Sequence, residues 1–352
     1  MALYSPEILE VRIGSGLNAL VDLQNETPLS IEIEKCRNRF EEEYGFSFPK
    51  VHIMEHCSLN SNEYSIVLNG IEVGRSTIRM NYHLCMNMRD VTRALDCSSW
   101  DKTKDPAFGI DGFYIPDDEV QKYIEAGYVC AKPERIIATH LFEIIRKNRI
   151  NLLNQKLVKT LMKKASRTNL DAISDVFAKY YFSTSDLITL LNYLLDEEVS
   201  IRDMDTILET VADNLHQNYK IYELGEKVRQ KLAYSFIKNY TDEKNVLHVA
   251  RISEELCKQI SNNACYPKSK KTIPYCMLEP KDWRKFYNFV LPSIQYFTEG
   301  NLYPVLVCES SVRPLLAKAL HIEMPGVRVI SDVELSLISN DITITVEKAF
   351  FR

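Results

Sequence analysis

The stretch Glu63–Ile78 reads EYSIVLNGIEVGRSTI, and it decides how the first third of the chain folds. Asn69 and Gly70 stand between two runs of residues that favour strands. Asn-Gly in this setting is the strongest short-range signal for a β-hairpin, because both residues accept the positive φ of a type I′ turn. The stretch therefore predicts two antiparallel strands joined by a tight turn.

The segments on either side of this hairpin add a strand and two helices. Ile8–Ile13 predicts a strand, and a helix is predicted to start at Pro28 behind an N-cap at Thr27 and to end at Gly45. Pro133–Lys147 has apolar residues at helical spacing, so we expect this second helix to return to the first region. Strands and helices are mixed here, which indicates α+β packing.

The rest of the chain changes character along its length. A short irregular module follows the hairpin, a stretch without Pro from 148 to 240 has helical periodicity, and the remainder alternates strand and helix. We predict a mixed α+β chain of four subdomains. After a linker end at 1–10, these are 11–83 with 133–152 (mixed α/β), 84–132 (inserted), 153–232 (helical) and 233–352 (α/β).

Composition and charge exclude several classes of protein. The 352 residues are 45% hydrophobic and 26% charged, which is typical of folded globular chains. A formal charge of −5 gives no basic footprint for nucleic acid. The most apolar run, Leu187–Leu195, is far shorter than the roughly 20 residues of a membrane helix. Nine Cys without a C-x-x-C pair or a secretory leader favour reduced thiols in a cytosolic protein.

Three motifs suggest chemistry but are better explained by structure. The GSGLNA stretch at Gly14–Ala19 resembles a dinucleotide fingerprint, yet no crossover helix follows it, so a strand bend is the better interpretation. His52, His56 and Cys57 lack the spacing of a zinc site on a strand. Lys156–Arg167 fits the solvated face of an amphipathic helix, with partner binding as the alternative. We expect no metal and no cofactor.

The stretch Asp101–Ile115, DKTKDPAFGIDGFYI, leaves two interpretations open. In the first, Asp105 and Pro106 start an ordinary turn and Phe108 fills a core. In the second, Phe108 is an exposed apolar anchor and Asp105 beside it is a directional polar group, a combination suited to a binding hot spot. The residues alone do not decide between them.

Several stretches together resemble the cytoplasmic half of the large export-gate protein of type III secretion systems, the FlhA/SctV family. They include VRIGSGLNALVD, GFSFPKVHI, YSIVLNGIEVG, KDPAFGIDGFYI, ERIIATHL, VSIRDMDTILETVAD and YPVLVCESSVRPLL, in family order from Glu10 to about Ser331. The overall likeness favours an injectisome member of the EscV type. The resemblance implies a non-enzymatic fragment whose transmembrane block, at the bacterial inner membrane, would precede Met1.

The resemblance also implies partners and a site. Members form a nonameric ring at the cytoplasmic face of the membrane and receive export chaperones with their substrates, gatekeeper proteins and stalk proteins of the export ATPase complex. Asp105, Phe108 and Thr139 match family positions that line a chaperone groove, and Ile136, one turn before Thr139, would add apolar area. Two rival hypotheses stay open: a soluble enzyme with an interdomain site, and a free-standing cytosolic adaptor.

Overall fold

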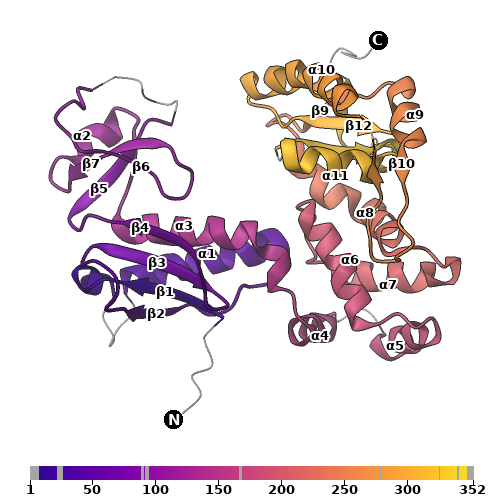
Figure 1. Cartoon of the computed structure of the whole chain (residues 1–352), viewed down its shortest axis with the longest axis horizontal. Coiled ribbons are helices and arrows are strands. Elements are labelled where there is room, and N and C mark those ends of the chain that lie inside the picture. The colour runs from indigo at the N-terminus through magenta and orange to yellow at the C-terminus, as the bar shows by residue number, and fades with distance from the viewer. Residues whose placement is uncertain are drawn as a thin grey trace. The chain divides into compact units, whose positions relative to one another are not determined.

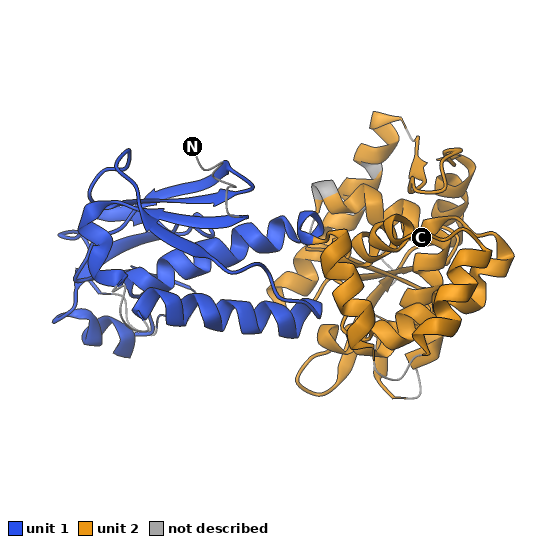
Figure 2. Ribbon diagram, turned by 90° about the horizontal axis from the view of Figure 1, so that it is seen from below, with its two compact units in different colours: residues 1–152 blue, residues 153–352 orange. Residues whose placement is uncertain are grey.

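The computed structural model describes residues 8–21, 27–88, 91, 95–165, 169–277, 279–324, 326–338 and 341–346. The chain divides into two compact units, residues 1–152 and residues 153–352 (Figure 2). Both units contain sheets and helices, which confirms the predicted mixed α+β class. The finer division into four subdomains stays a prediction.

The first sheet of unit 1 has the strand order β2-β1-β3-β4. Its strands are β1 (Leu9–Ile13), β2 (His52–Glu55), β3 (Glu63–Leu68) and β4 (Ile71–Thr77). β3 and β4 pair antiparallel, and between them Asn69 and Gly70 have φ values of 51° and 80°. Positive φ at both positions is what a type I′ turn requires, so the predicted hairpin is confirmed.

Helices α1 (Pro28–Tyr44) and α3 (Pro133–Lys147) pack against each other over this sheet (Figure 1). The Thr27 side chain accepts a hydrogen bond from the Ser30 backbone N–H at 3.2 Å, and Gly45 ends α1 with a φ of 87°. Both helix ends lie where the sequence predicts them, because the N-cap oxygen and the left-handed glycine satisfy terminal backbone groups.

Gly74 on β4 sets how closely α3 approaches the sheet. A Cβ atom at this position would lie 2.4 Å from Ile144 Cδ1 and 3.1 Å from His140 Cε1, both on α3. A methyl group at this position would displace the end of the Ile144 side chain and press on the His140 ring. Glycine therefore lets α3 lie close to this strand.

The second sheet of unit 1 has the order β6-β7-β5-β8. Its strands are β5 (Tyr82–Met86), β6 (Lys102–Lys104), β7 (Asp111–Pro116) and β8 (Val129–Ala131), with helix α2 at Val120–Glu125. A small core containing Ile115, Tyr123 and Tyr128 packs against this sheet.

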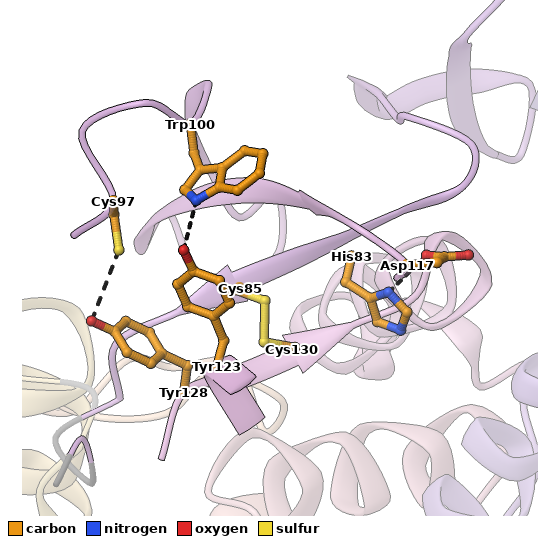
Figure 3. Close-up of a disulfide and its surroundings, with 8 residues drawn as sticks. All are labelled: His83, Cys85, Cys97, Trp100, Asp117, Tyr123, Tyr128 and Cys130. Carbon is orange, nitrogen blue, oxygen red and sulfur yellow. Dashed lines mark hydrogen bonds and ion pairs between the residues drawn. A yellow bond between two sulfur atoms is a disulfide. The ribbon is translucent and has the colours of Figure 1, made fainter. Parts of the chain in front are cut away.

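A disulfide joins Cys85 on β5 to Cys130 on β8 (Figure 3). These residues are direct antiparallel partners, and the expectation that all thiols are reduced is wrong for this pair. Partners facing each other across two strands bring their Cβ atoms close enough to bond. The two cysteines lie 45 positions apart in the sequence, so only the strand pairing reveals them.

The first part of unit 2 is helical. It contains α4 (Gln155–Lys164), α5 (Leu170–Lys179), α6 (Thr184–Asp196), α7 (Met204–Asn214) and α8 (Ile221–Ile237). Short 3₁₀ turns occur at Leu215–Gln217 and Lys238–Tyr240 here, and at Ser15–Leu20 and Arg149–Leu152 in unit 1. α4 buries Val158 and Leu161 and exposes Lys156 and Lys159, as the amphipathic interpretation predicts, whereas Arg167 lies outside the described residues.

The second part of unit 2 is a parallel sheet of order β13-β12-β9-β14. Its strands are β9 (Val246–Arg251), β12 (Val305–Cys308), β13 (Arg328–Ser331) and β14 (Thr343–Val346); the accompanying elements are α9 (Glu254–Asn262), α10 (Pro280–Glu299), α11 (Arg313–Glu323), α12 (Asp332–Ile338) and the small hairpin β10 (Ala264–Cys265) and β11 (Tyr275–Cys276). The central strand β12 is apolar and buried along its whole length, which is typical of a strand inside a parallel sheet covered by helices.

A buried network of charges joins α6 and α8 to α11 and α12, the helices that accompany this sheet. The Arg313 side chain is fully buried and donates to Glu197 Oε1 at 3.0 Å. Arg229 donates to Glu334 Oε1, also at 3.0 Å. Burial opposes ionisation of Glu197, but Arg313 and Arg229 outweigh it and lower the pKa of that carboxyl. The charges are thus paired in the core rather than left isolated, which burial requires.

Candidate docking site

The loop Asp105–Gly109 connects β6 to β7, and Asp105 holds it in shape. The Asp105 carboxylate accepts hydrogen bonds from the backbone N–H groups of Ala107 at 3.0 Å and Phe108 at 2.8 Å. Its own N–H donates to Ile110 O at 2.8 Å. Gly109 closes the turn with a φ of 70°, a value that suits glycine.

Asp105 and Phe108 have opposite exposures. Asp105 is 4% exposed, whereas Phe108 is 55% exposed. The interpretation of Phe108 as a core residue is therefore wrong. The expectation of Asp105 as an exposed polar contact is also wrong, because its carboxylate turns inward to satisfy the loop backbone. The large apolar side chain of Phe108 is thus exposed on a turn whose backbone is held by the buried Asp105 carboxylate.

Helix α3 carries the other two candidate residues. Thr139 is half-buried, and its hydroxyl donates to Arg135 O at 2.7 Å within the helix. Ile136 is 2% exposed, so the expectation that it offers apolar area to a partner fails on this surface. Ile136 belongs to the apolar face of α3 and is buried there together with Ile137 and Leu141.

His140 connects this helix electrostatically to the loop. Its Nδ1 lies 2.8 Å from the hydroxyl of Tyr64 on β3. Burial lowers the pKa of His140, and the nearby Asp105 carboxylate partly opposes that shift. Burial and the same carboxylate raise the pKa of Tyr64. Asp105 is therefore close enough to act on residues next to Thr139, and the loop and α3 belong to one region of unit 1.

Sequence reasoning does not identify the supporting residues Tyr64 and His140. They are 76 positions apart, and although both lie in stretches that carry the family resemblance, nothing local pairs one with the other. One signal was present: a histidine among the apolar residues of a helix indicates a buried imidazole that needs a hydrogen-bond partner. The partner itself can be found only after β3 and α3 are packed together.

The remaining motifs have structural roles. Gly14 N–H donates to Glu63 O at 2.8 Å, and a Cβ at Gly14 would lie 1.9 Å from Asn60 O. This glycine therefore serves a close backbone approach, and a 3₁₀ turn at Ser15–Leu20 follows it instead of a crossover helix. Among the described residues, no group of three or more His, Cys, Asp or Glu side chains could hold a metal ion.

Several solved structures have this fold, among them the nonameric EscV cytosolic domain from the type III secretion system, with a TM-score of 0.70 at 17% identity. The CdsV protein of Chlamydia pneumoniae superposes with a TM-score of 0.77 at 21% identity, covering 96% of this chain and 95% of that one. The nonameric SctV-C from EPEC gives a TM-score of 0.75 at 18% identity, with 98% of each chain covered. At these identities the likeness establishes the fold. Within the described ranges, the helices lack the length and apolar character needed to cross a bilayer.

The chain belongs to the FHIPEP family, whose model matches residues 1–339. It is 28% identical to the flagellar biosynthesis protein FlhA of Borreliella burgdorferi, over 93% of this chain and 46% of that protein. It is 31% identical to FlhA of Treponema pallidum, over 70% of this chain and 35% of that protein. The chain thus spans about half, or less, of the length of the curated relatives it matches.

Proposed function

We propose that this chain is the cytoplasmic platform of a type III secretion export gate, in an injectisome of the EscV type, at the inner membrane. The platform forms a nonameric ring and acts by binding, without catalysis. It receives export chaperones with their substrates, gatekeeper proteins and stalk proteins of the export ATPase complex. Family membership and the shared fold with nonameric SctV-C support this proposal.

The observation that carries the proposed docking role is the exposure of Phe108 on a loop held by Asp105. An exposed aromatic ring on a fixed turn loses little conformational entropy on binding and buries a large apolar area. Thr139 adds a polar group on α3. Ile136 is buried under α3, so in this proposal it packs within unit 1 and does not contact the chaperone.

The test is a titration of secretion chaperones from the host bacterium against Phe108→Ala and the original protein. Removal of a hot-spot side chain should cost at least ~2 kcal/mol of binding free energy, which is roughly a thirtyfold loss of affinity. Thermal unfolding of the variant should stay close to that of the original, because the ring is already exposed.

Ile71→Ala is the matched control, since Ile71 is also a large apolar residue of unit 1 and is 67% exposed. It should leave chaperone binding unchanged. Equal chaperone affinity of Phe108→Ala and the original protein would contradict the site. The enzyme and adaptor hypotheses are tested by light scattering of the chain, because neither of them requires assembly into a ring.

A further inference from the structure

A second exposed surface lies in unit 2, on the loop that joins β10 to β11. Lys268, Lys270 and Lys271 are all exposed on it. Tyr266 and Tyr275 flank the loop and are 51% and 41% exposed, and Met277 just beyond is 64% exposed. We call the segment 266–277 the lysine loop; Leu278 lies outside the described residues. The basic side chains thus lie in the middle of one short hairpin, and exposed apolar side chains lie at its two ends.

Backbone contacts fix the path of this loop. The carbonyl of Lys270 accepts from Ile221 N at 2.9 Å, and the carbonyl of Pro267 accepts from Lys220 Nζ at 3.0 Å. Lys271 Nζ lies 2.9 Å from Asp186 Oδ1 on α6. The loop is therefore organised before any partner arrives, which reduces the entropy cost of binding.

The surface carries excess positive charge. Lys220 Nζ lies 5.9 Å from the Tyr266 ring centroid, and Lys318 Nζ lies 5.7 Å from that of Tyr275. These positions allow cation–π attraction. Asp186 is paired with Lys271, and Glu223 accepts from the Lys220 backbone N–H. Within the described residues, the ammonium groups of Lys220, Lys268, Lys270 and Lys318 form no ion pair.

We propose that the lysine loop is a docking surface for an acidic segment of another protein that also carries apolar side chains. Unpaired lysines complement carboxylates, and exposed Tyr and Met side chains offer the apolar contacts of a protein hot spot. The formal charge of −5 on the whole chain favours a protein over nucleic acid or an anionic membrane, both of which attract proteins with a basic excess. The surface is independent of Phe108 and is tested independently of it.

The test uses fluorescein-labelled peptides and the whole chain. In one peptide Asp and Glu alternate with Phe and Leu; in the other, of equal charge, Gly replaces the apolar residues. The first should bind more tightly, and rising salt should weaken it. The double variant Lys268→Ala with Lys270→Ala should bind it about tenfold more weakly, while the Lys270 carbonyl keeps its contact with Ile221. Tyr266→Ala with Met277→Ala should lose the preference for the apolar peptide.

The matched control is Lys156→Ala with Lys159→Ala, which removes the same charge from exposed positions on α4. It should bind like the original, and thermal melts should show all variants folded. Equal peptide binding by the Lys268 and Lys270 variant would overturn the proposal. So would an absence of binding at about 1 mM peptide, or tighter binding of oligothymidylate or phosphatidylserine vesicles than of the apolar peptide.

Discussion

At the scale of single residues, the buried Asp105 carboxylate fixes the backbone of the loop that exposes Phe108. Asp105→Ala would leave the N–H groups of Ala107 and Phe108 without their acceptor. Unsatisfied buried groups cost about 1–3 kcal/mol each, so we expect lower stability of unit 1 in chemical denaturation, together with weaker chaperone binding. Asp105→Asn keeps an oxygen acceptor and should recover most of the loss.

Asp111→Ala is the control for this substitution, since the Asp111 side chain is 89% exposed in the next strand. It should unfold like the original protein. If Asp105→Ala has the same free energy of unfolding as the original protein, the Asp105 carboxylate does not stabilise the loop.

His140 makes the stability of unit 1 depend on pH. Burial lowers the pKa of this imidazole from 6.5, so the folded state favours the neutral form more than the unfolded state does. As pH falls below 6.5, the unfolded state binds a proton first and stability is lost until the lowered pKa is passed. His140→Gln should flatten this part of the curve of unfolding free energy against pH.

His216→Gln serves as the comparison, because His216 is exposed and hydrogen-bonded to Gln217. This variant should keep the free energy of unfolding of the original protein, because substitutions of exposed side chains change stability little. An identical slope for the His140 variant and the original would show that His140 does not contribute.

The residues alone left the exposure of Phe108 open, the family resemblance favoured it, and neither predicted the burial of Asp105. The pattern Asp-Pro-Ala-Phe-Gly indicates a turn from local rules, since Asp, Pro and Gly each restrict or relax the backbone in known ways. Which side chain faces inward depends on β3 and α3, which lie far away in the sequence. The same holds for Arg313, whose partners Glu197 and Glu226 come from other helices.

At the scale of elements, the disulfide between Cys85 and Cys130 ties β8 to the sheet of unit 1. Reduction should lower the free energy of unfolding of unit 1 by about 2–4 kcal/mol, measured by denaturation with and without a phosphine reductant. The double variant Cys85→Ser with Cys130→Ser should resemble the reduced protein and ignore the reductant.

Thiol counting provides an independent check. Under denaturing conditions without reductant, seven of the nine cysteines should react, because seven are free in the structure. Nine reactive thiols would contradict the disulfide.

Element boundaries were predicted well wherever a local signal was strong. The hairpin at Asn69-Gly70, the caps of α1 and the span of α3 all follow from turn and capping chemistry. The start of α2 at Val120 does not follow from a local signal, because this short helix depends on packing against the aromatic core around Tyr123.

At the scale of the whole molecule, the proposed ring should be weak when the chain is isolated. Tethering to a membrane raises the effective concentration of neighbouring copies, and the isolated chain lacks that contribution. We expect light scattering to show monomers at low concentration and larger assemblies as concentration rises. Strict monomers at every concentration, even after fusion to a ring-forming protein, would contradict the proposed assembly.

The parallel sheet of unit 2 has a consequence for synthesis on the ribosome. β14 is the last strand of this sheet in the sequence, and it pairs with β9 from Val246 onward. One edge of β9 therefore stays uncovered until Thr343 and the residues after it have been synthesised. A nascent chain that has emerged only as far as α12 therefore exposes an open strand edge, a surface that readily pairs with other chains. Unit 1 closes its own sheets from residues before 153. Before β14 is synthesised, the nascent chain is thus prone to aggregate through the uncovered edge of β9. Chaperones that bind unfolded chains should increase the yield most during this part of translation.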